Sequence, residues 1–175
     1  MKLGYSKWII AVSYTALIYL SLPFMRGILN YTREFFGGTG AFSVAVNTTL
    51  ALAAFGAVLI LINLRAGILR FAVFFLFAAA VIIIAAKKLD IPEERIHFIQ
   101  YGLCGYLYMN AALALSAAVW KKVSIAIAVT VLAGIGDELI QGILPSRVYD
   151  IRDIYFNSFA GVSGVILRKW IFSRK

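Results

Sequence analysis

Long apolar runs alternate with short polar stretches along the whole chain. An α-helix needs about 20 apolar residues to cross the roughly 30 Å hydrocarbon core of a bilayer. On this criterion the chain is predicted to form six membrane-spanning helices, at residues 8–25, 41–63, 68–86, 96–120, 123–144 and 154–172. Little sequence is left for a soluble domain. We therefore expect an all-α integral membrane protein, a bundle of about six transmembrane helices in one domain over residues 1–175.

The connections between these predicted helices differ in length on the two sides of the membrane. Two are tight hairpins, NLRAG at 63–67 and WKKVS at 120–124. Three are longer and more polar, at 26–40, 87–95 and 145–153. Irregular polar segments commonly carry function, so we expect the functional face on the side of the longer connections. The segment 26–40 fits either a short amphipathic stretch in the membrane interface or an ordinary loop.

Composition supports a membrane location. Hydrophobic residues make up 62% of the chain and the mean hydropathy is +0.90, whereas soluble domains average about 45–50% apolar residues. The basic start of the chain is also typical of a cleaved signal peptide. The apolar run that follows is long and no A-x-A-like cleavage site ends it, so we interpret it as the first span. The single cysteine, Cys104, excludes an intrachain disulfide.

The net charge of +9 is distributed as membrane topology requires. With the N-terminus inside, the cytoplasmic segments hold ten basic residues and no acidic one, and the opposite side holds seven basic residues and all eight carboxylates. Cytoplasmic loops carry such an excess of Lys and Arg, and all three tryptophans fall at predicted cytoplasmic ends. We expect both termini in the cytoplasm, an extracytoplasmic functional face, and anionic membrane lipids rather than nucleic acid as partners.

A dense group of polar residues follows the fifth apolar run, within 136–157. Asp137, Glu138 and Gln141 lie within about one helical turn, with Asp137 and Gln141 on one face. At about 1.5 Å per residue, Asp137 lies roughly 21 Å along the predicted helix and hence inside the bilayer. A carboxylate at that depth is costly unless it is paired, protonated or in a wet cavity. We interpret Glu138 as functional, with Arg147 as its partner across the turn.

The start of the sixth predicted helix continues this group. Asp150, Asp153 and Asn157 share one helix face there, and Asp150 also suits the N-cap position, with Asp153 close to the helix dipole. Arg147 and Arg152 add positive charge to the same turn. Pairing with the two aspartates is an alternative role for these arginines.

The fourth predicted helix brings a second set of polar residues to the same side. His97 and Tyr101 lie one turn apart, and Arg95 precedes them. Packing is an alternative role for Tyr101, and a salt bridge to Glu93 or Glu94 is one for His97. The fourth and sixth helices both begin on the outer side, where their N-terminal ends favour an anion. We expect an outer cleft with carboxylates on one wall and positive groups on the other.

No specific metal or nucleotide motif is present. One histidine in the chain excludes a three-histidine zinc site. The sequence holds no P-loop, no G-x-S-x-G elbow and no dinucleotide fingerprint. No cofactor is evident, although carboxylates beside an imidazole suit a divalent cation such as Mg²⁺, Mn²⁺ or Ca²⁺.

Two stretches carry a resemblance to a known family. They are IPEERIHFIQYGLCGYL at 91–107 and DELIQGILPSRVYDIRDIYFNSFAGVSG at 137–164, and together they resemble the VanZ-like membrane protein family. The matching residues are Glu94, Arg95, His97, Tyr101, Gly102, Glu138, Gln141, Arg147, Asp150, Asp153, Asn157, Gly161 and Gly164. The resemblance covers about residues 91–170, and Gln100 stands where many relatives carry an acid.

The resemblance implies a bacterial inner- or plasma-membrane protein of the cell envelope. The family's named member is linked to resistance to teicoplanin, a lipid-bearing glycopeptide that acts on cell-wall precursors outside the membrane. For this chain, the resemblance therefore raises a link to teicoplanin resistance as an expectation.

Four functions are consistent with the sequence. The first is an outer cleft that binds an anionic lipid-linked ligand or a lipoglycopeptide. Its candidate residues are Arg95, His97, Tyr101, Glu138, Gln141, Arg147, Asp150, Asp153 and Asn157. The second is an enzyme acting on a lipid-linked (pyro)phosphate, with Glu138 or His97 as general base and a divalent ion on Asp150 and Asp153. The others are a transporter and a purely structural network of buried ion pairs.

Overall fold

The computed structural model describes residues 2–88, 92–145 and 147–172, without the side chains of residues 2, 3, 85–88 and 92–94. Six α-helices and a final π-helical turn make up this part of the chain. They are α1 (Lys2–Phe35), α2 (Thr39–Asn63), α3 (Ile68–Lys88), α4 (Pro92–Ala112), α5 (Val119–Ile143), α6 (Ile151–Ile166) and η1 (Leu167–Ile171). The prediction of an all-α protein with six helices is confirmed.

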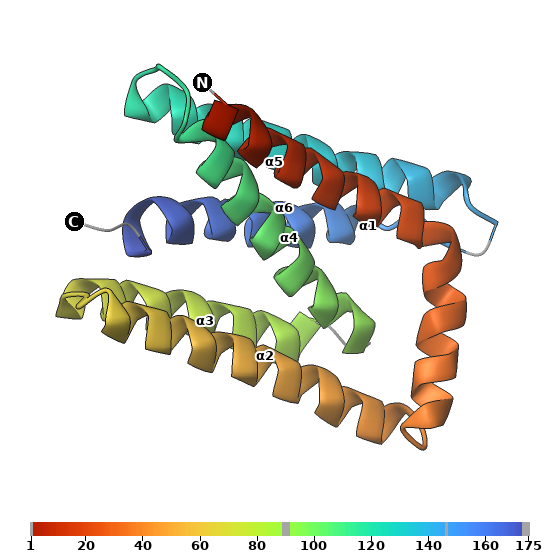
Figure 1. Cartoon of the computed structure of the whole chain (residues 1–175). Helices are drawn as coiled ribbons and strands as arrows, with labels where there is room; N and C mark the ends of the chain where they lie inside the picture. The colour runs from red at the N-terminus through yellow and green to blue at the C-terminus, as the bar shows by residue number, and fades with distance from the viewer. Residues whose placement is uncertain (1, 89–91, 146, 173–175) are drawn as a thin grey trace.

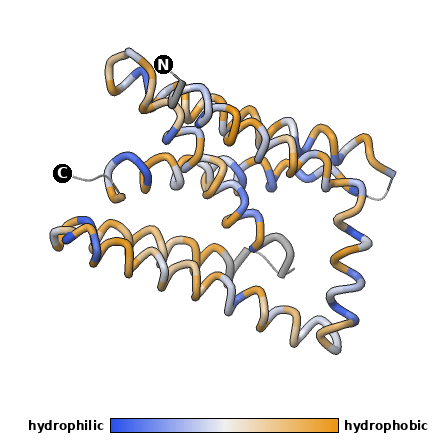
Figure 2. The backbone as a smooth tube through the Cα atoms, viewed as in Figure 1, coloured by the Kyte–Doolittle hydropathy of each residue, from blue (hydrophilic) through white to orange (hydrophobic). Residues whose placement is uncertain are grey.

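Three of the described helices are long and apolar enough to cross a membrane, namely α1, α2 and α5. α3 carries a shorter apolar stretch, Ile68–Ile84. Figure 2 shows the hairpin of α2 and α3 coloured as hydrophobic along nearly its whole length. These helices support a multi-pass membrane protein.

α4 lies at the centre of the molecule and packs against α1, α5 and α6 (Figure 1). Both termini lie at one end of the molecule, together with the turn between α2 and α3 and the connection between α4 and α5. The turn between α1 and α2 and the connection between α5 and α6 lie at the other end. The sequence predicted which connections share an end, but not their lengths, because residues 36–38 alone join α1 to α2, whereas residues 113–118 join α4 to α5.

Glycines on α4 and α6 allow these two helices to approach closely. A Cβ atom on Gly105 would meet the backbone carbonyl of Gly161, and a Cβ atom on Gly164 would meet the carbonyl of Gly102. Small residues commonly allow such close contacts between membrane helices. These four glycines are therefore packing residues.

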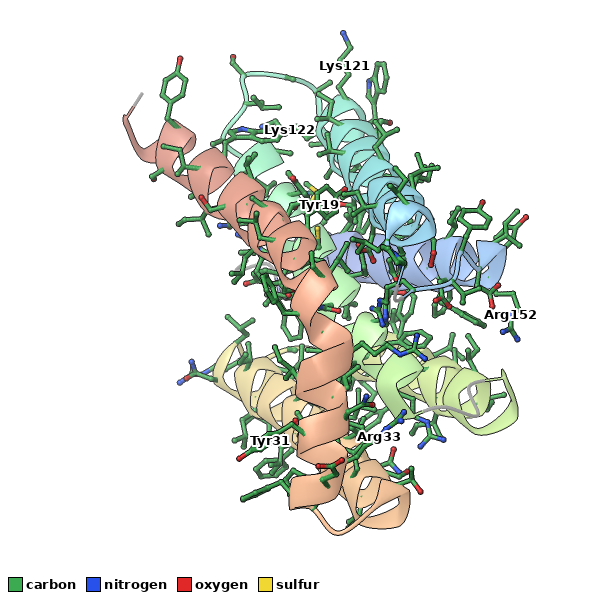
Figure 3. All side chains as sticks on the ribbon, turned by 90° about the vertical axis from the view of Figure 1, so that its right-hand side faces the viewer. Tyr19, Tyr31, Arg33, Lys121, Lys122 and Arg152 are labelled. Carbon is green, nitrogen blue, oxygen red and sulfur yellow. The ribbon has the colours of Figure 1, made fainter. Side chains whose placement is uncertain are left out.

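α1 does not end at Met25 as predicted but continues to Phe35. Pro23 lies inside the helix, where it removes a backbone hydrogen bond and bends the helix axis. After the bend, residues 24–35 run across the end of the molecule opposite the termini (Figures 1 and 3). The chain then turns at Gly37 and Gly38, whose φ angles of 78° and 117° suit glycine.

The connection between α4 and α5 also differs from the prediction. α4 ends at Ala112 and α5 begins at Val119, so the WKKVS segment lies in the first turns of α5 and not between the helices. Residues 113–118 are leucine and alanine except for Ser116, so hydropathy gives little sign that the helix ends here. Lys122 donates a hydrogen bond to the carbonyl of Leu113 (3.3 Å) and so satisfies an acceptor near the end of α4.

Candidate functional site

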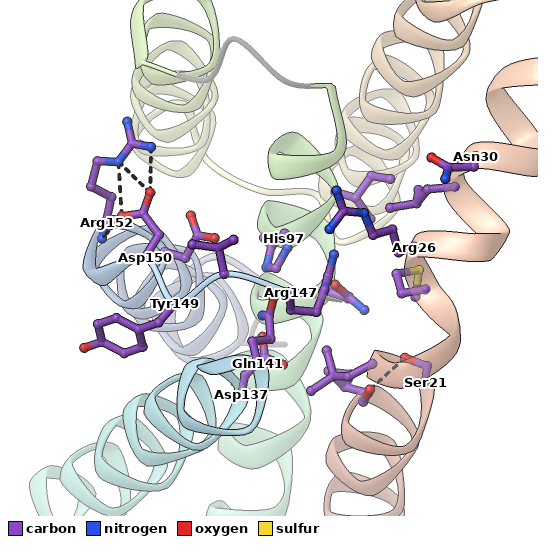
Figure 4. A pocket seen from close by; sticks show the side chains of 18 of the residues that line it. Ser21, Arg26, Asn30, His97, Asp137, Gln141, Arg147, Tyr149, Asp150 and Arg152 are labelled. Carbon is purple, nitrogen blue, oxygen red and sulfur yellow. Dashed lines mark hydrogen bonds and ion pairs between the residues drawn. The ribbon is translucent and has the colours of Figure 1, made fainter. Parts of the chain in front are cut away.

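A cavity of about 560 Å³ lies at the end of the molecule opposite the termini. We call it the polar cavity; side chains from α1, α4, α5, α6 and the connection before α6 line it (Figure 4). His97, Asp137, Gln141, Arg147, Asp150 and Asp153 are among them. Its volume falls within the range of about 300–1,000 Å³ typical of small-molecule sites.

α5 contributes two polar side chains to the lining of the polar cavity. Asp137 and Gln141 are four residues apart, on one face of the helix, and both side chains are buried while lining the cavity. This confirms their predicted common face. Glu138 is also completely buried, at 0% exposure, but it lies behind the cavity lining. Its Oε2 atom faces the backbone N–H of Asp150, which donates to it at 3.5 Å.

The predicted pairing of Glu138 with Arg147 is wrong. No ion pair joins these two residues, both of which the structure describes. Arg147 instead lies near Asp137 and favours the negatively charged form of that carboxyl group. Figure 4 shows Arg147 in the cavity beside Asp137 and Gln141. After α5 ends at Ile143, the chain brings the backbone of Asp150, and not the Arg147 side chain, against Glu138.

His97 reaches the cavity from α4 and is held by α6. Its Nδ1 atom lies 3.1 Å from Oδ1 of Asn157. Because an amide oxygen can only accept, Nδ1 carries the hydrogen and donates it. The imidazole ring also stacks on the Tyr101 ring, with centroids 6.3 Å apart and an interplanar angle of 8°. Asn157 and Tyr101 are both fully buried, so they fix the orientation of His97 rather than line the cavity.

Asp150 begins α6 as its N-cap, as the sequence predicted. Its carboxylate accepts a hydrogen bond from the backbone N–H of Arg152 (2.9 Å). The Arg152 guanidinium also pairs with it, with Nη2 and Oδ2 2.6 Å apart. The predicted pairing of Arg152 with an aspartate of this segment is therefore confirmed. These bonds from Arg152 hold the pKa of Asp150 below its ordinary value.

Arg95 does not belong to the polar cavity, although the sequence grouped it with the others. Its Nη1 atom donates to Oδ1 of Asn47 (3.0 Å) and to Oγ of Ser43 (3.4 Å), both on α2. Arg95 and His97 are two residues apart, so they point roughly 200° apart around a helix with 3.6 residues per turn. Packing of α4 directs His97 to the polar cavity and Arg95 to the opposite face.

The sequence analysis missed the wall that α1 contributes. Ser21, Arg26, Asn30 and Arg33 all line the polar cavity from this helix. Arg26, Asn30 and Arg33 follow one another at intervals of four and three residues, which places them on one helix face. That spacing is a signal of a helix face, and it would have favoured a helix over a loop in this segment.

Several buried polar atoms around the cavity have no hydrogen-bond partner among the described residues. These are Oη of Tyr101, Oδ1 of Asp137, Oε1 of Glu138, Nε2 of Gln141, Nε of Arg147 and Nδ2 of Asn157. Buried polar groups almost always find a partner in a protein or in ordered water. Both donors and acceptors occur in this set, so the site suits a ligand that carries oxygen acceptors as well as hydroxyl or amine donors.

The described residues bring no group of three or more His, Cys, Asp or Glu side chains into an arrangement that holds a metal ion. Glu93 and Glu94, the predicted partners of His97, have side chains outside the described set. No protein-family model, curated protein or solved structure matches the chain. The chemistry of the polar cavity is therefore the basis for assigning a function.

Proposed function

We propose that the polar cavity binds the anionic head group of a lipid-linked ligand or of a lipoglycopeptide. One observation carries this proposal: buried polar atoms of Asp137, Gln141 and Arg147 have no hydrogen-bond partner among the described residues, and all three side chains line one cavity. Leaving such groups unsatisfied costs about 1–3 kcal/mol each. A polar ligand that supplies the missing partners recovers that free energy on binding.

Charge at the cavity supports an anion as the ligand. Figure 4 shows Arg26 from α1 and Arg147 from the connection before α6 reaching into the cavity from different sides. Both guanidinium groups belong to the lining of one cavity, which also holds the carboxylates of Asp137, Asp150 and Asp153. Guanidinium groups also match the geometry of phosphate and carboxylate. Below them, Gln141 offers an amide donor and Asp137 an acceptor for the hydroxyl groups of the ligand.

The location of the cavity supports a lipid-linked ligand at the outer face. Among the described residues, eight basic ones belong to the segments at the end that carries both termini, and no acidic one does. By the excess of basic residues on the inner side, that end faces the cytoplasm. The polar cavity then opens at the extracytoplasmic face of a bacterial plasma membrane. Residues 24–35 of α1 lie across this end, and Arg33 and Tyr31 are part of that segment (Figure 3).

The site favours binding over the other functions that the sequence leaves open. A structural network of buried ion pairs would join Glu138 to a cation, and Arg147 does not fill that role. An enzyme would need its general base within reach of the substrate. Glu138 lies behind the cavity lining, which leaves His97 as the base for that alternative.

Ligand binding is tested by thermal unfolding of the purified full chain in detergent. We expect a polyprenyl phosphate to raise the unfolding temperature, because a ligand at a hundred times its Kd stabilises the folded state by about 2.7 kcal/mol. The uncharged polyprenol should give no such shift. Arg147→Gln should weaken binding by about tenfold to a hundredfold, since a hydrogen bond to a charged group contributes about 1.5–3 kcal/mol.

The matched control is Lys121→Gln, which removes a positive charge from the first turn of α5, at the opposite end of the molecule. This variant should keep the full shift with polyprenyl phosphate. Equal shifts with the phosphate and with polyprenol would contradict the proposal. Unchanged binding after both Arg147→Gln and Glu138→Gln would contradict it as well.

The resemblance to the VanZ-like family extends this proposal to a phenotype. We expect expression in a glycopeptide-susceptible Gram-positive host to raise the inhibitory concentration of teicoplanin and not that of vancomycin. Arg147→Ala and Glu138→Gln, matched for amount in the membrane, should both abolish protection, because each removes a charge from the group around the polar cavity. Protection that persists in both variants would separate the phenotype from this site. No protection by well-expressed wild type would refute the link to resistance.

A further inference from the structure

The hairpin of α2 and α3 is attached to the other helices near its two ends. At one end, α2 meets α4, where Arg95 bonds to Ser43 and Asn47. At the other end, Leu61 and Phe74 of the hairpin form a small buried core with η1. These two attachments hold the hairpin in place and leave the stretch between them open.

A second cavity, of about 810 Å³, lies between these attachments. We call it the apolar cavity; side chains of α2, α3, α4 and α6 line it, among them Ala54, Phe77, Leu103 and Ala160. The apolar cavity is open at the protein surface rather than enclosed, so the surrounding solvent can fill it. In a bilayer, the material at hand to fill such a space is the hydrocarbon chain of a lipid.

Charge at one end of the apolar cavity indicates which lipid fits. Arg95 lines the cavity together with Asn47, near the start of α2 and of α4. Leu167 and Phe172 line the far end, near the C-terminus. The cavity is thus apolar along its length with a guanidinium group at one end, as an amphiphile with an anionic head requires. Guanidinium groups bind phosphate through several N–H donors at once.

We propose that the apolar cavity holds a hydrocarbon chain of an anionic phospholipid whose phosphate contacts Arg95. This site is distinct from the polar cavity, because α4 separates the two. His97 faces the polar cavity and Arg95 the apolar one. The lipid completes the packing of the hairpin against α4 and α6 and does not depend on the ligand of the polar cavity.

Native mass spectrometry of the full chain, released from detergent after incubation with lipid, tests this site. The probes are dioleoylphosphatidylglycerol, which is anionic, and dioleoylphosphatidylcholine, which has the same chains and no net charge. We expect one phosphatidylglycerol molecule to be retained, with a preference of about tenfold over phosphatidylcholine, because the choline ammonium beside the phosphate weakens its attraction to the guanidinium group. Arg95→Gln should retain lipid but lose the preference.

Two neighbouring alanines on α3 give a matched pair for the hydrocarbon part. Ala78 lines the apolar cavity and is half-buried, whereas Ala79 is exposed and lies outside the lining. Ala78→Phe should displace the lipid, and Ala79→Phe should leave it bound. Arg147→Gln should leave it bound too, even where it abolishes binding in the polar cavity.

Three results would overturn this site. One is equal retention of the two lipids by the wild-type chain, which is measured without any substitution. Another is a preference for phosphatidylglycerol that survives Arg95→Gln. The third is equal retention in Ala78→Phe and Ala79→Phe when both variants elute as the folded protein.

Discussion

Gly105→Ala will destabilise the protein, whereas Gly56→Ala will leave its stability unchanged or raise it. A Cβ atom at Gly105 would collide with the backbone carbonyl of Gly161 across the crossing of α4 and α6. A backbone cannot rotate aside as a side chain does, so the two helices must separate. At Gly56, on α2, nothing lies within 4 Å of the new Cβ atom. Alanine there gains about 1 kcal/mol of helix propensity.

The two single-methyl changes therefore act in opposite directions. We expect Gly105→Ala to cost about 3 kcal/mol, the upper range for overpacking a core, because α4 is the central helix of the molecule. Gly164→Ala should behave like Gly105→Ala, since its Cβ atom would meet the carbonyl of Gly102. Unfolding in detergent, followed by loss of helical circular dichroism, measures both effects. Wild-type stability of Gly105→Ala would refute the close approach of α4 and α6.

Asn157→Leu will destabilise the protein strongly only while His97 is present. Leucine nearly matches asparagine in shape, so the main change is loss of the oxygen that accepts the hydrogen bond from Nδ1 of His97. A buried N–H group left without a partner costs about 1–3 kcal/mol. His97→Phe removes that donor and keeps a ring to stack on Tyr101. With both partners apolar, the cost should largely disappear.

A double-mutant cycle measures this coupling. The unfolding free energies of the wild type, the two single variants and the double variant should give an interaction energy of about 1–3 kcal/mol. The single variants should also weaken binding of polyprenyl phosphate, because His97 lines the polar cavity and Asn157 positions it. Additive costs would mean that the two side chains act independently and that Asn157 does not orient His97.

The sequence predicted those features that depend on residues near one another in the chain. The apolar runs predicted the approximate positions of all six helices, because the hydropathy of a segment depends only on its own residues. The spacing of Asp137 and Gln141 placed both on one face of α5, and Asp150 was predicted as the N-cap of α6. Each of these features follows from helix geometry and local hydrogen bonding.

The features that were mispredicted depend on contacts between distant segments. Arg95 was assigned to the polar site, but the rotation of α4 is set by its packing against α1, α5 and α6. The hydrogen-bond partner of Glu138 depends on the path of the chain after Pro145. This path brings the backbone N–H of Asp150 against the Glu138 carboxylate. The second part of α1 carries Arg26, Arg33 and Glu34. Because this segment is too polar for a membrane span, the prediction from hydropathy ended the helix at Met25, near the bend.

The position of α4 has a consequence for how the protein enters the membrane during synthesis. α4 carries Arg95, His97, Gln100 and Asn110, and polar residues of this kind make a single helix unfavourable in lipid. The hairpin of α2 and α3 is apolar and can insert by itself, but α4 becomes stable only among α1, α5 and α6. The last two of these helices are made after α4. We therefore expect α4 to be held in place only after the C-terminal third of the chain has been made.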